Sequence, residues 1–141
     1  MRELFESILD KFKQDVELYN LLDGHMYVDR APQKDMPEYV ALHLIDLIPD
    51  QEFEYGRRLE IARVQFSIRS QSSDSTRVME MFKAITAVYD RAVLLFRAQN
   101  YRSVMMSREM AILVKEPDNF WNYAVDYVVT LQPVTTTTSA P

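Results

Sequence analysis

Histidines and carboxylates are the side chains with which this sequence could carry out acid–base chemistry. His25 and His43 are the only imidazoles, and Asp46 follows His43 by three residues. Residues three apart on a regular strand point to opposite faces, so this pair is not expected to form a catalytic or metal site by itself. We interpret His43 as a strand histidine with a hydrogen-bond partner and His25 as a surface residue. A small enzyme that uses His43 is the alternative.

Other catalytic arrangements are not indicated. Glu52 and Glu54 could form a carboxylate pair, but such a pair needs a rigid pocket, and the neighbouring Arg57 and Arg58 are typical of a solvated charged loop. The serines between residues 67 and 75 have no nearby histidine, which favours loop and capping roles. The chain has no cysteine and only two glycines, so thiolate nucleophiles and glycine-rich phosphate loops are excluded. We therefore expect no catalytic residue, no cofactor and no metal.

Aromatic residues without a periodic partner point to binding instead. Phe53 and Tyr55 lie in the segment Asp50–Arg58, which we interpret as a protruding hairpin loop. The segment Tyr39–Asp46 is apolar on nearly both sides, as expected for a strand that another subunit covers. These two segments give the predicted protein interface: Tyr39, His43, Gln51, Glu52, Phe53, Glu54, Tyr55, Arg57 and Arg58.

The stretch from Leu59 to Tyr89 contains the clearest structural pattern. Val64, Phe66 and Ile68 alternate with polar residues, which predicts a strand with one wet face. Apolar residues at helical spacing from Val78 to Tyr89 then predict an amphipathic helix, and Ser73, Asp74 or Ser75 is a candidate for its N-cap. Leu59 and Ile61 are out of phase with the strand, so a bulge near Ala62 is expected.

The remaining elements follow from the same periodicities. An amphipathic helix runs from Leu4 to Tyr19 and is ended by Asp23-Gly24. The segment 92–100 suits either an extended edge or a helical turn, and methionines 79, 81, 105, 106 and 110 are expected to fill the core. The further strands are predicted at His25–Val28, Tyr39–Asp46, Val104–Val114 and Asn122–Leu131.

This order of elements predicts an α+β domain with a mainly antiparallel sheet of about four to five strands and two amphipathic helices packed on one face. One domain is expected over residues 1–132, followed by a disordered Thr-rich tail at 133–141. No apolar run reaches the length of a bilayer span, and the N-terminal residues do not resemble a signal peptide.

Charge argues against nucleic acid as the main partner. The formal net charge is −5, and affinity for nucleic acid comes mainly from phosphate neutralisation by Lys and Arg. Arg91, Arg97, Arg102 and Arg108 alternate with aromatic residues, but in an acidic chain ordinary salt bridges are the favoured interpretation.

In layout, the chain resembles the tail-completion or tail-terminator family of long-tailed bacteriophages, and the resemblance covers about residues 4 to 132. It rests on the proline-containing link of Ala31, Pro32, Gln33 and Pro37, and on the segments RVQFSI (63–68) and YAVDYVV (123–129). A group described as minor capsid or neck proteins is closely similar, and the two are not separated.

The resemblance implies a virion protein at the head-proximal end of the tail, assembled in the host cytoplasm. It implies a homo-oligomeric ring, of six subunits in the family, that stops growth of the tail tube. The tail tube protein and the head connector or stopper protein would be its partners, and DNA would pass through without specific binding. Another neck, head–tail connector or minor capsid protein of the same fold is the alternative.

Overall fold

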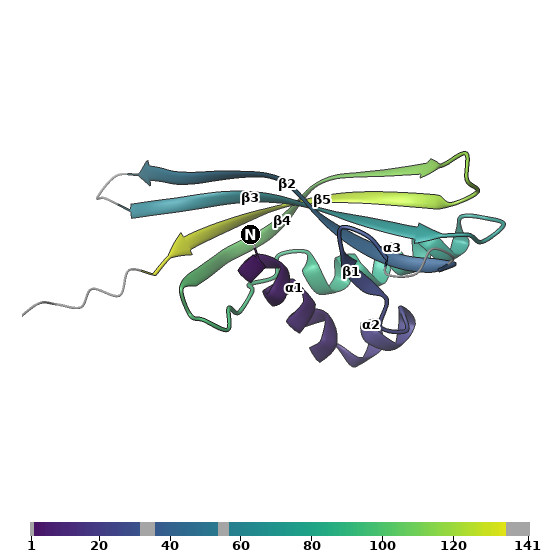
Figure 1. Cartoon of the computed structure of the whole chain (residues 1–141), viewed down its shortest axis with the longest axis horizontal. Coiled ribbons are helices and arrows are strands. Elements are labelled where there is room, and N and C mark those ends of the chain that lie inside the picture. The colour runs from purple at the N-terminus through teal and green to yellow at the C-terminus, as the bar shows by residue number, and fades with distance from the viewer. Residues whose placement is uncertain (1, 32–35, 54–56, 135–141) are drawn as a thin grey trace, which may run out of the picture.

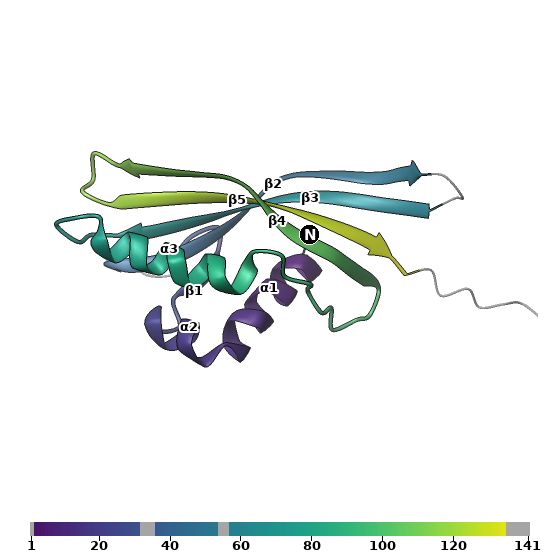
Figure 2. The same cartoon turned by 180° about the vertical axis from the view of Figure 1, so that it is seen from behind.

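A computed structural model describes residues 2–31, 36–53 and 57–134, with the side chains of residues 49–53, 57, 58 and 104 excepted. Helices lie on one side of a twisted five-stranded sheet, and the other side of the sheet is open (Figures 1 and 2). The elements in chain order are α1 (Arg2–Gln14), α2 (Val16–Leu21), β1 (Met26–Val28), β2 (Glu38–Phe53), β3 (Arg57–Ser70), α3 (Thr76–Tyr89), β4 (Tyr101–Lys115) and β5 (Trp121–Pro133).

The strand order is β1-β2-β3-β5-β4. Three of the four pairings are antiparallel, whereas β1 runs parallel to β2. The α+β class is confirmed, and the sheet is mixed because the short first strand joins it in parallel. The described residues form three helices in place of the two expected.

The extra helix arises because Asp15 interrupts the helix predicted from Leu4 to Tyr19. Asp15 has an extended backbone, and its carboxylate accepts a hydrogen bond from the Leu18 amide at 3.0 Å. A short acidic side chain that satisfies a free helix amide starts a new helix, so α1 stops at Gln14. The predicted end of the helical region at Asp23-Gly24 is confirmed, because both residues have positive φ.

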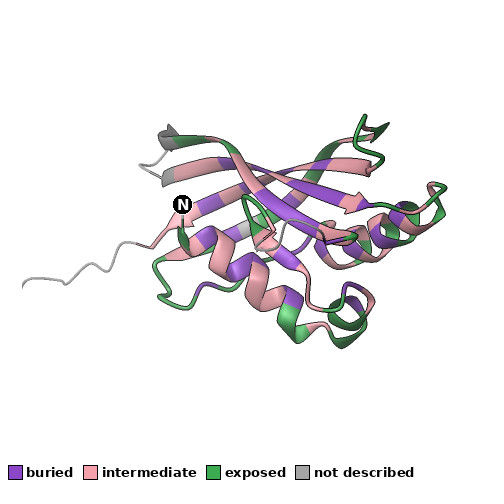
Figure 3. Cartoon of the chain, turned by 45° about the vertical axis from the view of Figure 1, so that its right-hand side comes forward, coloured by how far each residue is buried: buried purple, intermediate pink, exposed green. Residues whose placement is uncertain are grey.

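The core lies between the helices and the sheet (Figure 3). The predicted alternation in β3 is confirmed: Ala62, Val64, Phe66 and Ile68 are all fully buried. The ring of Phe66 lies 4.9 Å from that of Tyr89 in α3. One helix and two strands therefore share a continuous apolar interface: Val78, Met81, Ile85 and Tyr89 of α3 face Val125, Tyr127, Val129 and Leu131 of β5.

Two buried tyrosines use their hydroxyls to tie the helices to each other and to the sheet. The Tyr89 hydroxyl donates to the Ile8 carbonyl of α1 at 2.7 Å, and the Tyr127 hydroxyl donates to Asp90 at 2.6 Å. Burial raises the pKa of both phenols above the usual range. The two hydroxyls therefore stay protonated and keep donating.

The bulge expected near Ala62 is wrong, and the bulges of this strand pair lie in β2. Pairing of β3 with β5 runs without interruption from Glu60 to Ser70, so β3 has no bulge at Ala62. Pairing of β2 with β3 shifts twice, between Leu44 and Asp46 and between Ile48 and Gln51, and each extra residue is in β2. Leu59 and Ile61 are out of phase because they belong to the opposite face of the sheet.

Several smaller expectations can be compared with the structure. Of the three candidate caps, Ser75 occupies the N-cap position of α3 without a side-chain capping bond, and Asp74 accepts from the Thr76 amide at 3.0 Å. The segment 92–100 is irregular and extended, with Ala92, Leu94 and Phe96 buried between exposed neighbours. The first two residues of the predicted tail are ordered against the sheet: Pro133 is the last residue of β5, and the Val134 amide donates to the Asn100 carbonyl at 2.9 Å. Residues 135–141 lie outside the described residues.

Arg77 connects three elements, and its removal should destabilise the fold. Its guanidinium donates to Glu38 of β2 at 2.8 Å, to the Leu21 carbonyl of α2 at 2.8 Å and to Glu80 at 3.4 Å. The side chain is about three-quarters buried, so Arg77→Met should lower the free energy of unfolding by about 2 kcal/mol. Urea denaturation measures this, with the exposed Arg2→Met as the control. Equal effects of the two variants would contradict the role of Arg77.

Candidate interaction surface

The predicted interface residues all lie in β2, β3 and the turn between them. Tyr39 and His43 are in the first half of β2, whereas Gln51, Glu52 and Phe53 end that strand. Phe53 pairs with Arg57 and Glu52 with Arg58, so the loop predicted over Asp50–Arg58 is wrong for these residues, which continue the hairpin as strands. Glu54 and Tyr55 lie outside the described residues. The hairpin extends past the helices at one end of the sheet (Figure 1).

Tyr39 takes part in a cluster within the chain. Its ring meets that of Phe120 edge-on at 6.2 Å, and the guanidinium of Arg69 lies 4.7 Å from the centre of the Phe120 ring. Arg69 also binds Glu116 at 2.8 Å and Asp118 at 2.9 Å. These contacts attach the turn between β4 and β5 to β2 and β3, so Tyr39 has a structural role that its sequence position did not reveal.

His43 and Asp46 share a face of the sheet, contrary to the expectation from regular alternation. The bulge between Leu44 and Asp46 shifts the alternation, so that His43 pairs with Gln65 and Asp46 with Arg63 on the same side. Even so, the two side chains have different partners. Nδ1 of His43 lies 3.8 Å from Asp29, and Asp46 lies 3.6 Å from Arg63.

The face of the sheet opposite the helices is called the open face, and polar pairs run across its centre. It carries Arg63, Gln65, Ser67 and Arg69 of β3 and the residues that pair with them. Arg63 binds Glu109 at 2.9 Å, Gln65 donates to Asp126 at 3.0 Å, and Ser67 donates to Asn122 at 2.9 Å. These groups hold one another across the strands and so rigidify the sheet.

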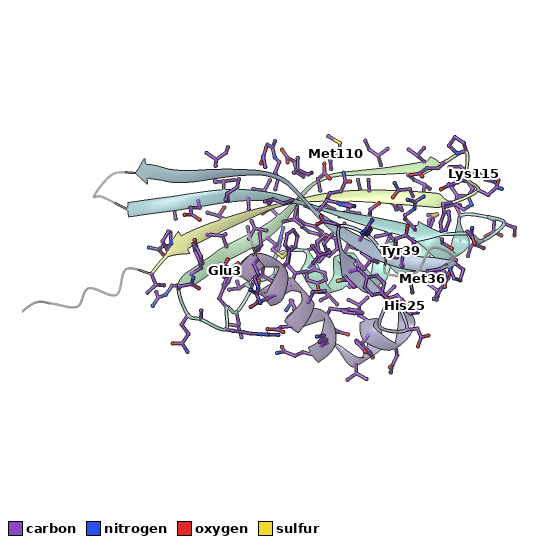
Figure 4. The ribbon with its side chains drawn as sticks, viewed as in Figure 1. Glu3, His25, Met36, Tyr39, Met110 and Lys115 are labelled. Atoms are coloured by element: carbon purple, nitrogen blue, oxygen red, sulfur yellow. The ribbon has the colours of Figure 1, made fainter. Side chains whose placement is uncertain are left out.

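Apolar side chains border this polar centre on both sides. On β4, Met110, Ile112 and Val114 are 51%, 50% and 49% exposed, and Figure 4 shows Met110 pointing away from the helices. On β2, Ile45 and Ile48 are 46% and 43% exposed. Exposed large apolar groups gathered on a rigid face are typical of a protein interaction surface.

The apolar border on β4 was not predicted, although the sequence carries a signal for it. The segment from Met110 to Val114 is apolar at every position, the pattern that predicted a second covering for Tyr39–Asp46. Methionine was expected to fill the core, which holds for Met81 and Met106, whereas Met79, Met105 and Met110 are exposed.

The described residues contain no group of three or more His, Asp or Glu side chains that could hold a metal ion. His25 lies 2.7 Å from the Tyr27 hydroxyl and 3.8 Å from Asp23, in a local surface cluster. A hollow of about 240 Å³ beside α1 contains Asp10, whose hydrogen bonds from Arg97 hold its pKa below the usual value. An Asp in such an ion pair is a weak base.

Two of the four arginines that could have bound nucleic acid (Arg91, Arg97, Arg102 and Arg108) instead bind carboxylates of the same chain. Arg97 binds Asp10 through two nitrogens, and Arg108 lies 3.3 Å from Asp90. These two agree with the salt-bridge interpretation. No helix in the described part of the chain has both the length and the hydropathy needed to cross a bilayer.

No protein-family model and no curated protein matches the sequence. Among solved structures, one that matches is a chain described as "Virion of native gene transfer agent (GTA) particle". The two chains superpose with a TM-score of 0.76 at 14% sequence identity, over 90% of this chain and 92% of the other. At this identity the likeness concerns the fold, and over nearly the full length of both chains the fold is the same.

Proposed function

We propose that this chain is a structural protein of a phage or phage-like virion, and more specifically a tail terminator that forms a ring at the head-proximal end of the tail tube. One observation carries the proposal. The whole fold, rather than a single motif, matches that of a chain from a gene transfer agent virion. The layout of the sequence supports it independently, because it resembles the tail-terminator family over about residues 4 to 132.

The surface is consistent with assembly. The open face combines a rigid polar centre with exposed apolar borders on β2 and β4, which suits contact with other protein subunits. The interface residues that we propose from the sequence are Tyr39, His43, Gln51, Glu52, Phe53, Glu54, Tyr55, Arg57 and Arg58. In this proposal the hairpin reaches toward the tail tube protein or the head connector.

The charge of the chain suits a ring through which DNA passes. The formal net charge is −5. The positive charges of Arg63, Arg97 and Arg108 are neutralised by carboxylates of the same chain. Such a surface offers DNA few contacts that would release counterions and slow its movement. We propose no specific binding of DNA, no cofactor and no catalysed reaction.

Localisation in purified particles tests the proposal. An affinity tag on this chain, detected with gold in electron micrographs of separated heads and tails, should mark the upper tip of headless tails. Label that stays with the heads instead would support the alternative, a neck, connector or minor capsid protein of the same fold. Particles without label would contradict a virion role altogether.

A further inference from the structure

The sheet has two edges at which backbone groups are free to bind another strand. β4 forms one edge, where Met106 uses the outer side through hydrogen bonds with Arg91 and Ala92. On the other side, β1 covers β2 only at Val40–Leu42. The stretches Ser107–Lys115 of β4 and His43–Phe53 of β2 each offer about 30 Å of free edge.

Charge favours contact between the two different edges over contact between two identical ones. The free stretch of β2 contains three carboxylates and no Lys or Arg, whereas that of β4 contains two cations and one carboxylate. A contact of β2 with β2, or of β4 with β4, would bring like charges together and weaken the pairing. A contact of β4 with β2 brings opposite charges together.

Several charges of the two strands are neutralised within the chain. Glu38 is bound by Arg77 and Asp46 by Arg63, and Arg108 and Glu109 of β4 also have partners within the chain. By sequence, the free stretch of β2 also contains Asp50 and Glu52, and that of β4 ends at Lys115. The sequences of the two stretches are therefore complementary in sign.

The apolar borders of the open face lie along the same two edges. Met110, Ile112 and Val114 belong to β4, and Ile48 belongs to β2, where it pairs with Ile61. If the two edges joined, these side chains would become neighbours on one continuous face and lose their exposure to water. Cross-strand apolar pairs of this kind stabilise sheets.

Strand direction is also compatible with a head-to-tail contact. β2, β3, β5 and β4 alternate in direction, so β4 runs opposite to β2. A second copy in the same orientation would therefore place its β2 antiparallel to β4 of the first. The two free stretches lie toward opposite ends of the sheet, as the end of β2 in Figure 1 and Lys115 in Figure 4 show. For the two stretches to meet, the strands must be inclined relative to the ring axis.

We propose that residues Ser107–Lys115 of β4 pair antiparallel with His43–Phe53 of β2 in a second copy of this chain. Because the two edges differ, the contact is head-to-tail, and its repetition closes a ring when the rotation between copies allows. The inference deepens the ring proposed above and rests on it for closure.

The absence of native cysteine makes this contact testable by site-specific cross-linking. The variant Ile48→Cys/Ile112→Cys would replace the native chain in cells that produce the particles. Isolated particles would then be treated with a short bis-maleimide, whose reach covers diagonal neighbours on a sheet. A denaturing gel should show a ladder of dimers, trimers and larger species that ends at the ring.

Three controls separate the outcomes. Ile48→Cys and Ile112→Cys alone should each remain monomeric on the gel, because a head-to-tail contact never joins a residue to its own copy. Dimers from either single variant would show a two-fold contact and overturn the pairing. Met79→Cys/Ile112→Cys, with one cysteine on α3, should give no ladder, and a ladder as strong as that of the test variant would also overturn it.

The cross-linking experiment also distinguishes failure of the edge pairing from failure of the proposed ring function on which the pairing rests. Particles that contain the protein in a ring, but yield no ladder from Ile48→Cys/Ile112→Cys, would overturn the edge pairing and leave the ring in place. Cross-links of the test variant to the tail tube protein alone would overturn it equally. Particles that lack the protein would overturn the proposed virion function itself.

Discussion

Phe66→Ala should lower the free energy of unfolding by about 4 kcal/mol, the largest effect on stability that we expect. Phe66 is fully buried at the centre of β3, with the ring of Tyr89 at 4.9 Å and that of Tyr127 at 5.3 Å. Its truncation would leave a cavity between the helices and the sheet, and neither tyrosine can move into it without losing the hydrogen bond of its hydroxyl. Urea denaturation followed by circular dichroism measures the change.

Phe82→Ala is the matched control for that prediction. Phe82 is also aromatic and stacks on Tyr123 with 4.0 Å between ring centres, but it is only partly buried at the rim of α3. We expect a loss of about 2 kcal/mol, because less apolar area is removed from contact. A loss for Phe82→Ala as large as that for Phe66→Ala would contradict the position of the core that we describe.

Ile112→Lys should dissociate the assembly while the subunit stays folded, and this is the largest effect on association that we expect. Ile112 is half exposed on β4, so the substitution should change the stability of the isolated chain by less than about 0.5 kcal/mol. In the proposed contact the same side chain is covered, and a lysine there would have to lose its water. The dissociation constant between subunits should rise about 100-fold, or about 2.8 kcal/mol.

The dissociation is measured by light scattering and by negative-stain images of the purified protein. If the ring assembles only on the tail tube, purified tails are imaged instead. Met79→Lys is the control, because Met79 is similarly exposed but lies on α3, away from the open face. It should leave the rings intact. Rings that survive Ile112→Lys, or that dissociate equally with Met79→Lys, would show that the apolar border of β4 is not the contact.

The parts of the fold that could be predicted are those in which local periodicity and burial agree. The alternation in RVQFSI and the helical spacing from Val78 to Tyr89 predicted β3 and α3, because each has one buried face. The break at Asp15 was missed, because the apolar spacing continues through it and only the capping bond to Leu18 reveals it. The spacing of apolar residues does not predict whether this region forms one helix or two.

The bulges in β2 show a second limit. The apolar residues Leu59 and Ile61 suggested a change of phase in β3, but they lie on the opposite face of a regular strand, and the extra residues are in β2. The same bulges put His43 and Asp46 on one face, which reverses the argument from regular alternation. Register depends on the partner strand, and a single sequence does not specify it residue by residue.

The exposed apolar borders of the open face were predicted only in part. Because Tyr39–Asp46 is apolar on nearly both faces, we predicted that another subunit covers this strand. The same reasoning applied to β4 would have predicted the exposed apolar residues Met110, Ile112 and Val114. In the structure Tyr39 packs on Phe120, whereas Ile45 within that segment and Ile48 beyond it are exposed. The contacts of the hairpin residues stay a prediction.

Tail length in particles made without this protein is the most direct measurement of the central claim. If the chain is a ring that stops tube growth and joins tail to head, its removal should yield tails of variable, excessive length and separate full heads in electron micrographs. Restoring the native chain, but not Ile112→Lys, should return tails to uniform length. Tails of normal length joined to full heads in the absence of the chain would contradict the account.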